Sequence, residues 1–133
     1  MKYTTICAIV ESNQGEILLT KRNREPFRGK WALFSGIGES KKGIPSKIGV
    51  VEEVNCDLGT STFKGKFLFS LPIENDPASD KVDVFAGKIN ENEIKVQPEF
   101  SQGIKWSSKS DKNSFKNLAF EHSKIIEKYL EKK

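Results

Sequence analysis

The first third of the chain carries short β-type runs of apolar residues separated by turn signals. Residues 4–10 and 16–22 are rich in β-branched and aliphatic side chains, and the turn signal at residues 12–15 lies between them. This order predicts a β-hairpin. A polar loop follows, and a short apolar strand is expected at residues 31–34.

A glycine-rich loop over residues 35–43 leads into a predicted helix. Pro45 suits a first helical turn, and Asn55 is a natural C-terminal stop. The apolar residues that recur at helical spacing, and that we expect on the inner face, are Ile44, Ile48, Val51 and Val54.

The second half of the chain predicts more strands and a closing helix. Strands are expected at residues 63–71, 82–89 and 104–106, with one more short strand as an option at 94–96. The closing helix is expected over residues 113–132, with an apolar stripe of Phe115, Leu118, His122, Ile125, Ile126, Tyr129 and Leu130. The order of elements implies one α+β domain over residues 1–133, with a mixed sheet.

Composition narrows the class of protein. Of the 133 residues, 36% are hydrophobic and 30% charged, so a packed core is expected, and no run approaches the roughly 20 apolar residues of a membrane span. Cys7 and Cys56 form neither a disulfide framework nor a metal-ligand spacing, which indicates a reducing, cytoplasmic setting. The net charge of +4 suits an anionic ligand, but the lysines are too scattered to favour nucleic-acid binding.

Several stretches resemble one family when they are taken in order. Residues 17–22 (ILLTKR) and 29–36 (GKWALFSG) are similar to the lead-in "LLxxR…GxWxxPGG" of the Nudix box, and residues 50–55 (VVEEVN) to its end, "UxEExG", where U is aliphatic. Residues 97–99 with Trp106, and residues 118–122, are similar to the second half of MutT-like members.

The resemblance implies a fold and a chemistry. The fold is an α/β/α sandwich with a central mixed sheet, and the activity is hydrolysis of a nucleoside diphosphate linked to another group. The usual cofactor is Mg²⁺ or Mn²⁺. Hard divalent cations bind carboxylate oxygens, mask phosphate charge and acidify water, and carboxylates on successive helical turns converge on such cations.

The box departs from the family pattern at several positions. Counting back from Glu52 and Glu53, the Arg-Glu positions fall on Ile48 and Gly49, and Asn55 replaces the final Gly. Gly36 to Glu52 spans 16 steps, about three fewer than in the family. In one register Glu39 is the glutamate of the loop; in the other Gly43 replaces that glutamate and the helix has lost nearly one turn. The loss at Gly49 removes a third helical carboxylate in both.

The candidate site residues follow from this alignment. Catalytic candidates are Glu52, Glu53 and Glu99; metal-binding candidates are Glu52, Glu53, Gly36 and Glu39; substrate-binding candidates are Arg22, Arg28 and Trp31. Adjacent glutamates lie about 100° apart around a helix, so Glu52 and Glu53 need not both face inward. The structural alternatives are a solvated charged pair for the two glutamates, surface arginines, and a packing role for Trp31 and His122.

Two functions remain open at this stage. The first is a MutT-like hydrolase that acts on a nucleotide-type small molecule with Mg²⁺ or Mn²⁺. The second is a Nudix-fold module that binds a nucleotide or a partner without turnover, which the losses at Ile48 and Gly49 favour. The resemblance also allows a homodimer, and no residue pattern identifies which nucleoside diphosphate derivative is bound.

Overall fold

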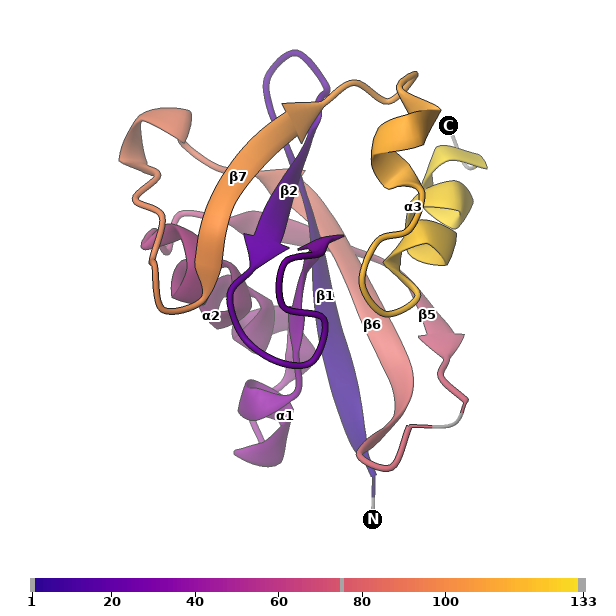
Figure 1. The fold of residues 1–133 in the computed structure, drawn as a ribbon. Coiled ribbons are helices and arrows are strands. Elements are labelled where there is room, and N and C mark those ends of the chain that lie inside the picture. The colour runs from indigo at the N-terminus through magenta and orange to yellow at the C-terminus, as the bar shows by residue number, and fades with distance from the viewer. Residues whose placement is uncertain (1, 75, 132–133) are drawn as a thin grey trace.

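The computed structural model describes residues 2–74 and 76–131, and Figure 1 shows the arrangement of their helices and strands. The strands are β1 (Tyr3–Glu11), β2 (Ile17–Arg22), β3 (Trp31–Ala32), β4 (Phe34–Gly36), β5 (Lys64–Pro72), β6 (Ser79–Lys88) and β7 (Ser101–Ser107). The helices are α1 (Gly38–Lys41), α2 (Ser46–Leu58) and α3 (His122–Glu131), with 3₁₀ turns η1 (Glu91–Glu93) and η2 (Lys112–Phe115). None of these helices is long and apolar enough to cross a membrane.

The strands form one mixed sheet built around β1. The main order is β3-β2-β1-β6-β5, while β4 also pairs with β1 and β7 with β2. The β1–β6 pair is parallel, and the pairs of β1 with β2, β2 with β7 and β5 with β6 are antiparallel. The predicted hairpin of the first two strands and the mixed sheet are confirmed.

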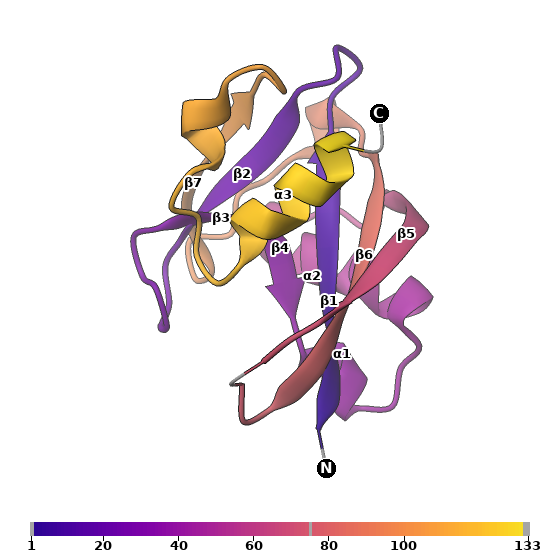
Figure 2. The same cartoon turned by 90° about the vertical axis from the view of Figure 1, so that its right-hand side faces the viewer.

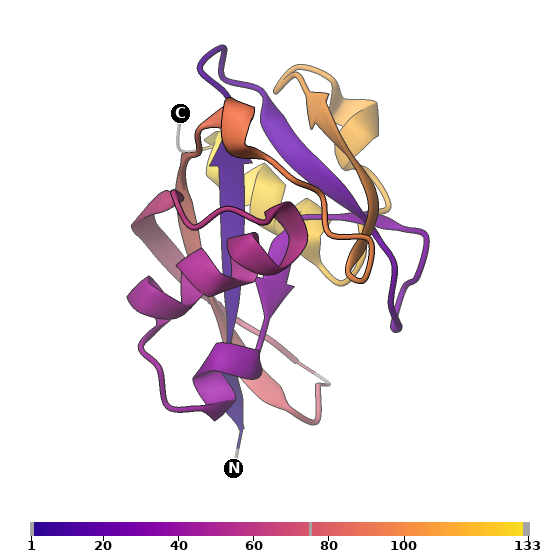
Figure 3. The ribbon, with the colours of Figure 1, turned by 90° about the vertical axis from the view of Figure 1, so that its left-hand side faces the viewer.

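The alternation of side chains along β1 creates two cores, one on each face of the sheet. Ile6 and Ala8 pack on the face that carries α2, while Cys7 and Ile9 pack on the face that carries α3. Figure 2 shows α3 in front of the sheet, and Figure 3 shows α2 in front of the opposite face. The expected α/β/α sandwich is therefore present.

Helix α2 is longer and turned differently from the predicted helix. It continues beyond Asn55 and ends at Leu58. Gly59 follows as a left-handed cap, with a φ of 64° and an N–H that donates to the Asn55 carbonyl. Ile48, predicted to face inward, is 60% exposed. The buried residues are Gly49, Val50, Glu53, Val54 and Leu58. The inner face predicted from the apolar residues was therefore wrong at Ile48, because Gly49 and Glu53 lie on the buried face of the helix.

The closing helix is shorter than predicted. Residues 112–115 form a separate 3₁₀ turn, and α3 starts only at His122. Asn117 and Phe120 have φ values of 57°, in the left-handed region, and such values interrupt a right-handed helix. Phe115 and Leu118 are buried as expected, although they lie before α3.

The optional strand at residues 94–96 is absent from the described chain. This segment pairs instead with the end of α2, because the N–H groups of Lys95 and Gln97 donate to the carbonyls of Leu58 and Asp57. The last carbonyls of a helix need partners, and this loop supplies them. The contact fixes the C-terminal end of α2 in place.

Gly59→Ala is expected to lower the free energy of unfolding by about 1–3 kcal/mol, because a side chain is strained at this φ and its β-carbon would lie 2.8 Å from the Lys95 carbonyl oxygen. Urea unfolding measures the change. Gly38→Ala is the matched control, since nothing lies within 4 Å of a β-carbon at that position. Equal stability of the two variants would contradict the assigned cap.

Candidate active site

The carboxylate of Glu53 lies directly against the backbone of Gly36. A β-carbon at position 36 would be 2.6 Å from Glu53 Oε2 and 2.8 Å from Oε1, so only glycine fits there. Glu53 is 8% exposed, and no described residue gives its carboxylate a hydrogen bond or an ion pair. No buried side-chain nitrogen or oxygen of the described residues lacks a hydrogen-bond partner, so the unpartnered Glu53 oxygens reach solvent while the rest of the residue is buried. A largely buried carboxylate that opens to solvent is a candidate functional group.

Burial and neighbouring charges raise the pKa of Glu53. Loss of water is the largest cause, and the negative charges of Glu39 and Asp57 add to it, while the positive charge of Arg24 acts in the opposite direction. The result is a pKa of about 7. A carboxyl group that titrates near neutral pH is suited to proton transfer or to binding a cation.

Asp57 is a further candidate for the site that the sequence did not suggest. It follows Glu53 by four residues, so both side chains project from the same side of α2. Burial raises the pKa of Asp57 to about 6, opposed by a hydrogen bond from Thr20 and by Arg24 and Arg22. The helix was predicted to end at Asn55, so Asp57 was not considered as a helical residue. A helix that continues to Leu58 places Glu53 and Asp57 four residues apart on one side.

Glu39 lies at the place where the box has lost its glutamate. A β-carbon at Gly49 would be 2.9 Å from the Glu39 β-carbon and 2.8 Å from Ile6 Cδ1. The Glu39 side chain is 14% exposed, and it pairs with Lys42 at 3.6 Å. Helix α1 thus places the Glu39 side chain beside Gly49, which lies one turn before Glu53 on α2. Both registers of the box stay predictions.

Glu52 and Glu99 are not gathered with these carboxylates. Both side chains are exposed, and neither is among the charges that shift the pKa of Glu53. Glu99 lies in a loop whose neighbouring carbonyls, of Pro98 and Phe100, accept hydrogen bonds from Asn23. Their roles as ligand or base stay predictions.

The arginines of the segment after β2 provide positive charge beside the carboxylates. The charges of Arg22 and Arg24 both act on Asp57, and that of Arg24 also acts on Glu53. Arg28 bonds instead to Asn23 and pairs with Glu25 within its own exposed loop. Arg24, which the sequence analysis passed over, is therefore better placed than Arg28 to meet an anionic ligand.

Trp31 and His122 both pack against neighbouring residues, and the substrate-binding roles of Trp31 and Arg28 stay predictions. Trp31 is half-buried against the α3-side core, and Lys105 Nζ lies 4.5 Å from its ring centroid. His122 Nδ1 accepts from the Leu33 N–H at 3.0 Å, so Nε2 carries the proton and donates to Ser35 Oγ at 3.1 Å. Burial lowers the pKa of His122 to about 3, and the neutral ring fixes the strand that presents Gly36.

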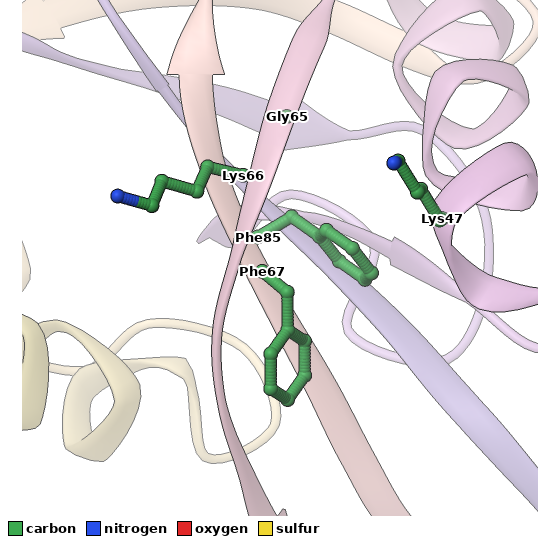
Figure 4. Close-up of a pocket in the computed structure, with 5 residues that line it drawn as sticks. All are labelled: Lys47, Gly65, Lys66, Phe67 and Phe85. Carbon is green, nitrogen blue, oxygen red and sulfur yellow. The ribbon is translucent and has the colours of Figure 1, made fainter.

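A groove of about 490 Å³ lies away from these carboxylates, between α2 and the edge of the sheet. Figure 4 shows Lys47 on α2 across from Gly65, Phe67 and Phe85 on the strands. None of the site's carboxylates lines this groove. We therefore do not assign the active site to this groove, although it is large.

Solved structures share this architecture along nearly the whole chain. The Nudix domain of Shewanella oneidensis NrtR, complexed with ADP ribose, has a TM-score of 0.79 at 19% identity and covers 99% of this chain and 88% of that one. The MutT protein of Methanosarcina mazei has a TM-score of 0.79 at 20% identity, over 98% and 94% of the two chains. The chain has the Nudix fold. The resemblance found in the sequence is confirmed at this level.

A curated relative extends the likeness to sequence. The ADP-ribose pyrophosphatase of Methanocaldococcus jannaschii is 29% identical over 130 residues, which are 92% of this chain and 69% of the relative. No family model matches the chain. The shortened box with Ile48 and Gly49 is the main departure from the Nudix pattern.

The donor set suits a divalent cation that is bound by few protein ligands. Within residues 2–74 and 76–131, no three His, Cys, Asp or Glu side chains gather as a ready metal site. Mg²⁺ typically takes one or two carboxylates, with water and substrate phosphates completing its shell. The Glu53 carboxylate, with Asp57 one turn further along α2 and Glu39 on α1, fits that requirement.

Glu53→Gln is expected to stabilise the metal-free chain at high pH. The pKa of Glu53 is raised from 4.5 to about 7, so its protonated form favours folding, and that contribution is lost as pH rises from about 4.5 through 7. At pH 8 the neutral amide should raise the free energy of unfolding by roughly 2–3 kcal/mol, with little change at pH 4. Denaturation at several pH values measures this, and exposed Glu52→Gln is the control. Identical pH profiles for the two variants would rule out the buried carboxylate.

Gly49→Glu, which restores the family's glutamate, is expected to destabilise the chain by about 1–3 kcal/mol. Its side chain would collide with Ile6 and with the Glu39 β-carbon. The double variant Gly49→Glu with Glu39→Gly should recover part of the loss, because it removes one of the two collisions. Thermal or urea denaturation compares the variants, and a stable Gly49→Glu chain would show that Glu39 does not occupy this space.

Proposed function

We propose that this chain is a Nudix hydrolase that cleaves the pyrophosphate of a nucleoside diphosphate derivative. The single observation that carries the proposal is the Glu53 carboxylate held against the Gly36 backbone, within reach of the charges of Glu39 and Asp57. ADP-ribose is the substrate to test first, because the curated relative is named for its hydrolysis and a structural relative is complexed with it.

The acidic residues would hold the cofactor. Glu53 would be the main ligand of Mg²⁺ or Mn²⁺, with Glu39 and Asp57 as the nearest additional carboxylates. Gly36, Glu52 and Glu99 keep the ligand or base roles that the family alignment predicts for them. When bound, the cation would neutralise phosphate charge and lower the pKa of a bound water.

The neighbouring arginines would bind the substrate. Arg22 and Arg24 lie close enough to Asp57 for their charges to lower its pKa, so a pyrophosphate at the carboxylates meets two guanidinium groups as well. Guanidinium pairs well with phosphate oxygens because its donors form a planar fork. These residues would orient the phosphates and offset the acidic cluster's repulsion of an anion.

A second candidate function is a nucleotide-binding module without turnover. Gly49 removes a carboxylate of the helix, and α1 supplies Glu39 with an ion pair to Lys42 already in place. That pair reduces the charge available for a cation. Binding would then depend on the arginines rather than on metal.

The test is metal-dependent turnover of ADP-ribose. The purified chain with Mg²⁺ or Mn²⁺ should release AMP, measured as phosphate after added phosphatase. Glu53→Gln should reduce the rate by at least about 100-fold, because the main cation ligand is lost. Glu39→Gln and Asp57→Asn should each reduce it by about 10-fold, as second ligands do.

Two controls make the result specific. Exposed Lys47→Gln leaves every carboxylate of the site unchanged and should keep full activity. Chelation of the metal should abolish release, and added Mg²⁺ should restore it. Nucleotide binding without any turnover, unaffected by metal, would reject the hydrolase and support the binding module.

A further inference from the structure

The groove between α2 and β5 has an aromatic floor and an exposed aromatic wall. Phe85 on β6 is only 3% exposed, whereas Phe67 on β5 is 52% exposed, and their rings meet edge to face with centroids 5.5 Å apart. The cross-strand pairing of these two residues holds the Phe67 ring at the surface. We call this site, which is lined by Lys47, Gly65, Lys66, Phe67 and Phe85, the edge groove.

Gly65 keeps the floor of the edge groove open. A β-carbon at this position would lie 2.5 Å from Cε2 of Phe63, so the Phe63 ring fills the space beside the glycine. Phe63 is buried, and with Val51 and Lys64 it lines an adjoining hollow of about 320 Å³. Because the two hollows share lining residues, they form one strip along β5.

The charge around this strip is positive. Lys47, Lys64 and Lys66 line it, and no aspartate or glutamate of the described residues does. None of the three lysines forms an ion pair with a carboxylate of residues 2–74 and 76–131. Figure 4 shows Lys47 and Lys66 on opposite sides of β5. The aromatic rings therefore lie between cations that have no counter-ion within the described chain.

Protection of the sheet edge accounts for only part of this pattern. Lysines on an outer strand deter the pairing of another strand, which accounts for Lys64 and Lys66. Edge protection does not account for Lys47, which belongs to α2, or for the half-exposed Phe67, which makes an edge more adhesive. The edge groove thus combines an apolar contact point with charge of one sign, as recognition surfaces do.

We propose that the edge groove binds an acidic peptide segment of a partner protein, with one apolar side chain packed on Phe67 and flanking carboxylates near the lysines. The groove is open along β5, and an open groove suits a peptide better than a small molecule, which needs a cleft that encloses most of its surface. The rings supply contact area, and the lysines select against basic segments. The groove is separate from the carboxylates of the candidate active site, so this inference does not depend on the proposed hydrolase.

The test begins with a selection from a library of random short peptides against the immobilised full chain. The double variant Lys47→Glu with Phe67→Ser removes background binders. The selected peptides should carry one aromatic or aliphatic residue flanked by aspartate or glutamate. Fluorescence anisotropy of a dye-labelled selected peptide then measures affinity, which high salt should weaken because salt screens the lysine charges. Thermal melting checks that each variant is folded.

Lys47→Glu and Phe67→Ser should each weaken binding of the selected peptide by about 10-fold. Phe67→Tyr keeps the ring and should bind as the unaltered chain does. Lys112→Glu makes the same change of charge on an exposed residue of η2 and should have no effect. No enrichment over the double variant, selected peptides without acidic residues, or equal affinity in both single variants and the unaltered chain would overturn the proposal.

Two other outcomes would identify a different occupant. Binding to phosphatidylserine vesicles that is lost in Lys47→Glu and Phe67→Ser, with no peptide selected, would show that the edge groove meets an anionic membrane. A dimer in sedimentation that Phe67→Ser dissociates would show that a second copy of the chain covers the groove. Either result would mean that the peptide proposal is wrong.

Discussion

The close approach of the Glu53 carboxylate to the Gly36 backbone is the constraint on which the site depends. It joins the central helix to a strand that pairs with β1, and it does so through a charged group that folding alone would avoid. Other features support it from outside: Gly59 and the 95–97 segment hold the end of α2, and His122 holds the strand that carries Gly36. The scaffold thus holds the Glu53 carboxylate against the backbone of Gly36.

The fold could be predicted largely from the sequence because its signals are local. The alternation along β1 and the turn between the first two strands each identify an element without knowledge of its neighbours. The inner face of α2 could not be found in this way. Position 49 is a glycine because the Glu39 side chain fills the space beside it, and Glu53 fits on the inner face because Gly36 has no side chain; only the packed structure shows this.

Part of the candidate site could be predicted from the sequence, and part could not. Glu53, Gly36 and Glu39 came from alignment to the family box, and the structure brings these three together. Asp57 and Arg24 were missed because they lie outside the box, one on an extra turn of helix and the other in a loop.

The outermost strand, β5, bears on how this domain meets other proteins. Its exposed lysines at 64 and 66, its register shift between Phe67 and Phe69, and its final proline all interrupt a regular hydrogen-bonding edge. A strand from another molecule that approached β5 would meet the ammonium groups of Lys64 and Lys66 and an irregular row of backbone hydrogen-bonding groups. Growth of the sheet by strand addition, the usual route from an open β-edge to fibrous aggregates, is therefore blocked at this margin by the chain's own sequence.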